Sequence, residues 1–264
     1  MLMEVKNQIK VIFLSVKYNI MKQMINKVTF LTNIFFMILN NASFIIQWII
    51  LFCIRDNIGG YTLKEVILLW GLASSIFGLA QIFFYKAFEL SDLIINGKLD
   101  VFLVQPKNVF LSAITSETSI SAIGDFLYGY ICLIIYGISI KKLLLFTIFA
   151  ITGCIIMTSF TSILGSLSFW IVKGDILADA LTNTMINFAT YPGTIFKGFI
   201  KIILYTIVPV GAANYLAVET ILNFDILKFV YIIGFTIVIV SIAFLVFYKG
   251  LKRYSSSNLM SSRI

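Results

Sequence analysis

The chain has 264 residues, of which 60% are hydrophobic and only 12% are charged. A soluble domain is typically about half apolar and about a quarter charged, so this composition excludes a soluble enzyme, a nucleic-acid-binding domain and a disordered tail. Most of the chain must lie in a bilayer, where each spanning helix needs about 20 apolar residues. The length then allows about five to seven spans.

The net charge is +8, from 20 Lys and Arg against 12 Asp and Glu. In a membrane protein this excess is typical of basic cytoplasmic loops that contact anionic lipid. The chain has no histidine, which excludes histidine-based triads and metal sites. Its three cysteines, Cys53, Cys132 and Cys154, stand in apolar runs without CxxC spacing, and we expect buried free thiols.

The first 26 residues predict an amphipathic helix that lies in the cytoplasmic interface. Lysines are spread along the whole segment, which argues against a signal peptide with one compact apolar run. Lys6, Lys10 and Lys17 are four and seven residues apart and share one helical face. We therefore expect residues 1–26 to be an interfacial helix with its lysines at the headgroups. A ragged start of the first span is the alternative.

Six apolar stretches follow and are predicted to span the membrane. Thr62 and Glu65 have the spacing of a capping box at the start of the second stretch. Small residues in that stretch, such as Gly71 and Gly78, allow another helix to approach closely. Residues 191–222 are interrupted by proline, glycine and lysine, which predicts a re-entrant segment on the outer side. The predicted spans are residues 28–54, 65–88, 110–139, 143–172, 175–190 and 226–248, and a frayed serine-rich tail is expected at 255–264.

Residues 89–107 form the one substantial polar loop between the predicted spans. Asn96-Gly97 is a helix C-cap signal, and a second short segment is expected to stop before Pro106. The apolar residues of this loop would lie on the membrane or on a docked protein, with the charges turned outward.

Several polar residues stand inside the predicted spans. Asn33, Asn40 and Asn41 interrupt the first span, and polar amides in a span prefer a side that faces protein. The spans at 110–139 and 175–190 also carry polar faces that are too polar to contact lipid. These faces line either a translocation path or a contact with another subunit, and the candidate residues are Glu117, Asp125, Asp179 and Asn183.

Motifs for catalysis are missing from the sequence. It contains no GxxxxGK[ST] phosphate loop, HExxH, GxSxG or acidic metal cluster. Asp175 and Asp179 are the nearest candidates for a metal-dependent membrane enzyme, but aspartate near the start of a helix is more simply explained by the helix dipole. We therefore expect no catalytic residue, no metal site and no cofactor in this chain.

Basic residues set the expected orientation. With the N-terminus inside, 13 of the 20 Lys and Arg residues lie on the inner side and 7 on the outer side, which favours six spans with both termini cytoplasmic. The inner residues are Lys6, Lys10, Lys17, Lys22, Lys27, Lys86, Lys98, Lys107, Lys173, Lys249, Lys252, Arg253 and Arg263. The outer ones are Arg55, Lys64, Lys141, Lys142, Lys197, Lys201 and Lys228.

With this layout the chain resembles the permease subunit of ABC-2-type exporters. It is most similar to the branch with paired permeases, which includes viologen exporter-type systems. The likeness covers nearly the whole chain and is most specific at 92–106. It is carried by Tyr61-Thr62-Leu63, Gly71-Leu72-Ala73, Phe77-Gly78-Leu79-Ala80, Asp92-Leu93-Ile94, Gly97-Lys98-Leu99-Asp100, Phe102-Leu103-Val104-Gln105-Pro106, Phe169-Trp170, Tyr191-Pro192, Pro209 and Asn214-Tyr215-Leu216-Ala217.

The resemblance implies an all-α, type V exporter-like protein of the plasma membrane that is not itself an enzyme. Two copies of a separate ABC ATPase, which binds ATP and Mg²⁺, would drive it. A second ABC-2 permease, a different chain rather than a copy, would complete it. The substrate would be an amphipathic or lipid-like molecule or a small toxic compound.

The resemblance also implies roles for particular residues. Residues implied to couple to the ATPase are Glu89, Leu90, Asp92, Leu93, Gly97, Lys98, Leu99 and Asp100, with the leucines packing on it. The outer gate would include Tyr191, Pro192 and Pro209. The alternatives are an ion-coupled secondary transporter, although no internal repeat of the kind such folds often show is evident, and a lipid-modifying membrane enzyme.

Overall fold

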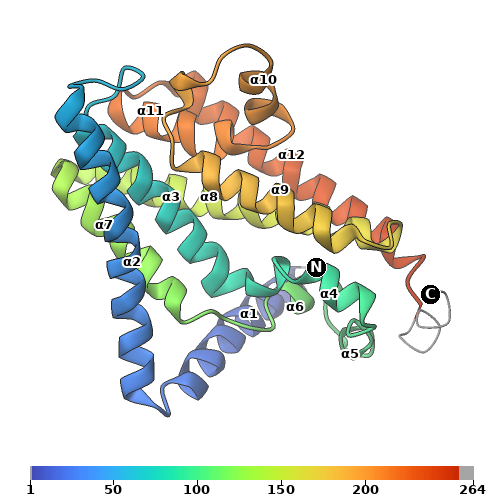
Figure 1. Ribbon diagram of the computed structural model, residues 1–264. Helices are drawn as coiled ribbons and strands as arrows, with labels where there is room; N and C mark the ends of the chain where they lie inside the picture. Colours follow the sequence, from blue (N-terminus) through green and yellow to red (C-terminus); the bar gives the residue numbers. More distant parts are fainter. Residues whose placement is uncertain (1, 256–264) are drawn as a thin grey trace.

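The computed structural model describes residues 2–255, and this part of the chain is helical, without strands. The expected all-α class is therefore confirmed. Except for Ser255, the tail predicted at 255–264 lies outside the described residues. The long elements, shown in Figure 1, are α1 (Leu2–Gln23), α2 (Lys27–Ile54), α3 (Leu63–Phe84), α7 (Ser121–Gly137), α8 (Ile140–Ser166), α9 (Gly174–Ala189) and α12 (Ile226–Leu251).

Short helices connect these long ones at the two ends of the bundle. Those at the end where the termini lie are η1 (Tyr85–Ala87), α4 (Leu90–Ile95), α5 (Asp100–Leu103), α6 (Val109–Ile114) and η2 (Leu167–Phe169). Those at the opposite end are η3 (Gly193–Ile195), α10 (Gly198–Thr206), the single π-helical turn η4 (Gly211–Tyr215) and α11 (Leu216–Leu222).

Helix length gives fewer clear spans than the sequence predicted. In the described residues, four helices are long and apolar enough to cross a bilayer, or five if the bent pair α10 and α11 is counted as one. The predicted spans at 110–139 and 175–190 correspond to the shorter helices α7, of 17 residues, and α9, of 16 residues. At about 1.5 Å per residue, α9 is about 24 Å long, against a hydrocarbon core of about 30 Å. The number of six spans therefore stays a prediction.

The stretch predicted as one span at 110–139 is broken between α6 and α7. Hydroxyl groups bind backbone carbonyls here, because Thr115 Oγ1 donates to Leu111 at 2.7 Å and Ser116 Oγ to Ala113 at 2.8 Å. Such bonds compete with the helical ladder. The break corrects the prediction of a continuous helix through this serine- and threonine-rich sequence.

Helix α1 supplies hydrogen-bond donors to the break. Ser15 Oγ, Asn19 Nδ2 and Gln23 Nε2 donate to the backbone carbonyls of Thr115, Ser116 and Thr118, at 2.9, 3.0 and 3.3 Å. The opposite face of α1 carries the exposed lysines Lys6, Lys10 and Lys17. The helix therefore has the two faces expected from the sequence, and its place in the membrane interface stays a prediction.

Helices α3 and α7 pack so closely that their backbones touch. A Cβ built on Gly129 would lie 1.9 Å from Ser75 Oγ and 2.3 Å from the Gly71 carbonyl, and one on Gly78 would lie 2.6 Å from the Phe126 amide nitrogen. Small residues permit this approach. The prediction of a close helix contact along the second span is confirmed, and α3 becomes the centre of the bundle with α8 on its other side.

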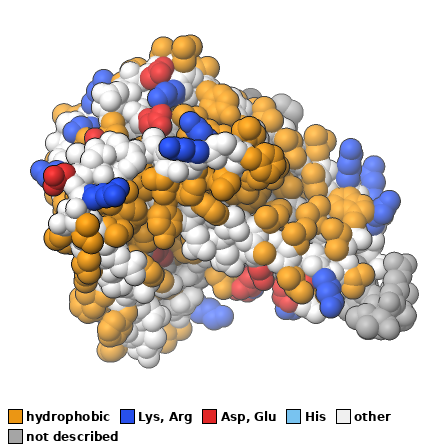
Figure 2. Space-filling view, turned by 45° about the horizontal axis from the view of Figure 1, so that its top comes forward, with side chains coloured by type: hydrophobic (Ala, Val, Ile, Leu, Met, Phe, Trp, Pro, Cys, Tyr) orange, Lys and Arg blue, Asp and Glu red, His pale blue; other side chains and the backbone are white. Residues whose placement is uncertain are grey.

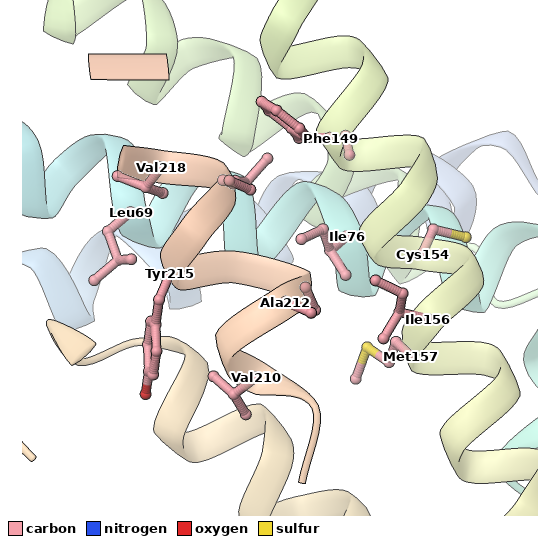
Figure 3. Packing of buried hydrophobic residues seen from close by; sticks show 14 of the residues in the cluster. Leu69, Ile76, Phe149, Cys154, Ile156, Met157, Val210, Ala212, Tyr215 and Val218 are labelled. Atoms are coloured by element: carbon pink, nitrogen blue, oxygen red, sulfur yellow. The ribbon is translucent and has the colours of Figure 1, made fainter. Parts of the chain in front are cut away.

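The outer segment folds back into the bundle. Helix α10 and the stretch formed by η4 and α11 (Gly211–Leu222) meet at 77°. The π-helical turn η4 is buried against α3 and α8, and Figure 3 shows its Ala212 close to Ile76. Tyr215 is 1% exposed, and its hydroxyl donates to the Phe188 carbonyl at 2.6 Å. Pro209 is buried just before this turn, where its missing N–H cannot continue α10.

Charged and hydrophobic side chains are separated on the surface of the protein. Figure 2 shows a broad band of hydrophobic side chains between charged residues at the two ends of the visible face. Helix α2 is the least buried of the four long apolar helices, since only 11% of its most apolar stretch is buried. Cys53 on α2 is exposed, whereas Cys132 and Cys154 are buried, and all three are free thiols. The expected burial was therefore wrong for Cys53.

Candidate functional site

A cavity of about 310 Å³ lies at the middle of the bundle beside α3. It reaches the surface between α2 and α9, where the lining residues Asn40 and Asn187 are exposed. Its polar lining is Asn40, Asn41, Ser74, Asp125, Asn187, Thr190 and Asn214. The large apolar side chains of the lining include those of Met37, Phe44, Trp70, Phe77, Met157 and Met185.

Asp125 is the one charged residue in the cavity lining. It is 4% exposed and stands in the first turns of α7, where the close approach of α3 buries it. Asn41 Nδ2 donates to Asp125 Oδ1 at 2.6 Å, and Ser74 Oγ donates to the Asp125 carbonyl at 2.9 Å. The second carboxylate oxygen, Oδ2, has no hydrogen-bond partner. The expectation that amides of the first span face protein is confirmed for Asn41, while Asn33 and Asn40 are exposed.

The other predicted polar residues of the spans lie elsewhere. Asp179 and Asn183 are exposed on α9 and do not line the cavity. Glu117 stands in the break before α7, with its carboxylate 3.0 Å from Lys86 Nζ. The structure therefore brings only Asp125 of this set to the cavity.

Sequence reasoning did not single out Asn214 and Trp70 as cavity residues. In the sequence, Asn214 stands among the residues that carry the resemblance to ABC-2 permeases, and it lines the cavity because the π-helical turn inserts into the bundle. Trp70 gave no signal, since a tryptophan in an apolar helix is typical of ordinary packing. No periodicity of one segment could have joined residues from α2, α3, α7, α9 and η4.

The 89–107 segment contains two short helices, as the sequence predicted. Helix α4 ends in a Schellman motif, with the Lys98 amide bonded to the Leu93 carbonyl at 2.9 Å and the Gly97 amide to the Ile94 carbonyl at 3.3 Å. Gly97 has φ +68°, which is the left-handed conformation that the motif requires. Asp92 pairs with Lys98 Nζ at 2.7 Å and also accepts from Asn96. The chain therefore reverses at a rigid corner between α4 and α5.

The three leucines of this segment that were predicted to pack on the ATPase, Leu90, Leu93 and Leu99, face the protein's own interior. Leu90 and Leu99 are fully buried and Leu93 is 4% exposed, in a cluster with Phe169 and Phe247. This corrects the expectation that they pack on a partner, because the ends of α8 and α12 already cover them. The apolar side chains left exposed are instead Val101, Leu103 and Val104, at 62%, 42% and 85%.

Ionic contacts tie the start of the 89–107 segment to the bundle. Lys86 Nζ lies 2.6 Å from Glu89 and 3.0 Å from Glu117, and Tyr85 donates to Glu89 at 2.8 Å. Tyr254, after α12, packs against the cluster that holds Leu90 and Leu99, and burial together with the Asp100 carboxylate raises the pKa of its hydroxyl. The segment is therefore tied to η1 and to the break before α7, and it packs on a residue after α12.

The three residues predicted as an outer gate lie within the 191–222 segment, Tyr191 and Pro192 before α10 and Pro209 after it. Tyr191 is 46% exposed and packs edge-on against Trp48 of α2, with ring centroids 5.7 Å apart. Pro192 is buried next to it, and Pro209 precedes η4. The described residues hold no group of three or more His, Cys, Asp or Glu placed to bind a metal.

Comparison with known proteins gives one match. Residues 37–258 match the model of a family described as ABC-2 family transporter protein. No curated protein and no solved structure matches the chain. Because the match covers most of the chain, it confirms the resemblance at the level of the family, while the branch with paired permeases stays a prediction. Membership in this family also implies an ABC ATPase as a partner. The chain belongs to the ABC-2 family and is a membrane permease component of an ABC transporter.

Proposed function

We propose that this permease is the transmembrane subunit of an exporter that moves an amphipathic or small toxic compound out of the cell. Two copies of a separate ABC ATPase bind and hydrolyse ATP with Mg²⁺ and dock on the 89–107 segment. The chain spans the plasma membrane with both termini in the cytoplasm. The observation that carries the proposal is the rigid connection between the 89–107 segment and the helices that line the cavity.

This connection gives a mechanical route from the ATPase to the cavity. Helix α3 runs through η1 into α4, and α3 also supplies Trp70, Ser74 and Phe77 to the cavity lining. Helix α4 packs on α8, which contributes Met157 to the same lining. A force on the 89–107 segment therefore acts on two cavity walls, and rigid-body motion of packed helices is a common way to switch a protein between states.

The exposed part of the 89–107 segment supplies a docking surface. Val101, Leu103 and Val104 form an apolar patch at the end of the protein where the termini lie, and Asp92 and Lys98 place charges at its edge. Apolar anchors surrounded by polar residues are typical of protein interfaces.

Val104→Asp is expected to remove the ATPase from the purified permease. Val104 is 85% exposed, so the change adds a charge to the docking surface without disturbing the core. The measurement is a tagged pull-down in mild detergent, with mass spectrometry to identify and quantify a stoichiometric P-loop ATPase. Ile140→Asp, at an isoleucine 80% exposed at the start of α8, is the matched control and should retain the ATPase.

Two results of this pull-down would contradict the proposal. Equal recovery of the ATPase with both variants would show that it does not dock on the 89–107 segment. Its absence from the unmodified protein, under conditions that preserve other complexes, would favour an ion-coupled transporter. The same sample reports on the second permease, which we propose to be a different chain that packs on the exposed polar stripe of α9, formed by Asp179, Asn183 and Asn187.

The orientation can be tested with single cysteines at the two ends of the bundle. In a Cys53→Ala background, Asp56→Cys should react with a membrane-impermeant maleimide in intact cells. Lys173→Cys should react only after permeabilisation, because the turn before α9 is placed on the inner side. Both positions are exposed, and Cys132 and Cys154 are buried. The reverse pattern would place the termini outside.

A further inference from the structure

The buried atoms of the cavity lining that lack a hydrogen-bond partner are both acceptors. Two lining side chains have such an atom, namely Asp125 Oδ2 and Asn214 Oδ1. Asp125 is 4% exposed and Asn214 is 1% exposed. Unpaired buried acceptors are costly in an apolar environment, so a hydrogen-bond donor brought to either oxygen would stabilise the site.

The amide nearest to the Asp125 carboxylate is already engaged. Asn41 Nδ2 donates to both Asp125 Oδ1, at 2.6 Å, and the Met37 carbonyl, at 3.0 Å. Both N–H groups of Asn41 are therefore used, and Asn41 has none left for Asp125 Oδ2. A bound molecule can bring its own donor to this oxygen.

The charges and the side-chain types of the cavity lining restrict the chemical class of the ligand further. The cavity lining contains one carboxylate and no lysine or arginine, so it offers no partner for an anionic headgroup. Phe44 and Trp70 stack with centroids 5.4 Å apart, and Met157 and Met185 add polarisable thioethers. Aromatic faces and thioethers suit an apolar or aromatic body that carries a positive charge.

The size of the cavity favours small substrates. Its volume of about 310 Å³ is at the lower end of small-molecule sites, which range from about 300 to about 1,000 Å³. A two-chain phospholipid or a folded peptide is much larger than this. The cavity matches a compact molecule with one polar end.

We propose that the cavity binds a protonated lipophilic amine, whose N⁺–H group donates to Asp125 while its apolar body lies against Phe44, Trp70 and the methionines. This inference rests on the proposed function, for which it names the class of substrate. Pairing an ammonium with a buried carboxylate neutralises both charges, and a charge-assisted hydrogen bond is about twice as strong as a neutral one. A quaternary ammonium lacks the N–H and leaves Asp125 Oδ2 unpaired.

A matched series of probes tests the class on the unmodified, full-length protein. The probes are 4-phenylbutyl-dimethylamine, 4-phenylbutyl-trimethylammonium and 4-phenylbutyrate, measured by isothermal titration calorimetry in a neutral detergent at pH 7. We expect the tertiary amine to bind about tenfold or more tightly than the quaternary ion, and the carboxylate not to bind measurably. Equal affinity of the two cations would overturn the role of the N–H donor, and binding of the carboxylate would overturn the charge preference.

Variants then assign the binding to the cavity. Asp125→Asn keeps the size of the side chain and should weaken binding of the tertiary amine about tenfold or more, since a hydrogen bond to a charged group is lost. Asp56→Asn removes the same charge from the exposed turn after α2 and should leave binding unchanged. Equal affinity of the two variants, both monodisperse by size-exclusion chromatography, would contradict the proposed site.

The binding experiment and the pull-down fail independently. If an ATPase copurifies with the permease but amine binding does not depend on Asp125, the proposed ATP-driven function is supported and the proposed substrate class is contradicted. Amine binding that depends on Asp125 without any ATPase would retain the site and remove the ATP-driven mechanism.

Discussion

Replacing Gly129 with alanine is expected to destabilise the protein strongly, and replacing it with valine is expected to prevent folding. The added Cβ would lie 1.9 Å from Ser75 Oγ and 2.3 Å from the Gly71 carbonyl. The serine side chain can rotate, but the carbonyl belongs to the backbone of α3, so α3 and α7 would have to separate. Overpacking of this kind costs about 1–3 kcal/mol or more, and here it acts on the contact that holds the centre of the bundle.

The same substitution elsewhere provides the control for this prediction. Gly234 lies on α12, where a Cβ meets no atom within 4 Å, and alanine is favoured over glycine in a helix by about 1 kcal/mol. Gly234→Ala should therefore have a thermal midpoint in detergent at least as high as the unmodified protein. Gly129→Ala should have a markedly lower midpoint and a smaller monodisperse fraction by size-exclusion chromatography. Similar midpoints for the two variants would show that α3 and α7 are not in backbone contact.

Replacing Gly97 with valine is expected to reduce the amount of copurified ATPase by about tenfold while leaving membrane insertion intact. Gly97 has φ +68°, and the left-handed conformation costs a residue with a Cβ roughly 1–2 kcal/mol, which corresponds to about a tenfold change in an equilibrium. A β-branched residue is at the high end of this cost. The chain would leave α4 in another direction and displace Val101 and Val104 from the docking surface.

Asparagine at the same position serves as the control. It shows whether the effect of valine comes from the backbone conformation or from the presence of any side chain. Asn tolerates the left-handed region better than other residues with a Cβ and often ends helices, so Gly97→Asn should recover the ATPase within about twofold of the unmodified protein. Quantitative mass spectrometry of the tagged complexes, normalised to permease in the membrane fraction, compares the two variants. Equal recovery of the ATPase with Gly97→Val and Gly97→Asn would show that docking does not depend on the Schellman corner.

Local signals in the sequence were sufficient for several elements. The Thr62 amide donates to the Glu65 carboxylate at 2.7 Å at the start of α3, as the capping-box spacing predicted. The corner at Asn96-Gly97 and the close contact made by Gly78 were also predicted from nearby residues alone. Caps and glycine contacts are readable because the residue types that satisfy them are few.

Features that depend on distant partners could not be predicted in the same way. The break between α6 and α7 is stabilised by donors from α1, about 100 residues away along the chain. Leu90 and Leu99 alternate with charged residues like a docking surface, yet the end of α12 covers them. The cavity combines Asn41, Asp125 and Asn214 from three elements, and only the folded bundle shows that two of their oxygens lack a partner.

The contact of α1 with the break before α7 makes the N-terminal helix a part of the membrane domain. The family match begins at residue 37, downstream of Ser15, Asn19 and Gln23, which donate to the carbonyls of Thr115, Ser116 and Thr118. A chain trimmed to the matched residues would leave those three carbonyls without these donors, next to Glu117 and its ion pair with Lys86. Helix α1 thus stabilises the break between α6 and α7. Any change that displaces α1 also weakens the attachment of the 89–107 segment, because Glu117 in the break pairs with Lys86 just before that segment.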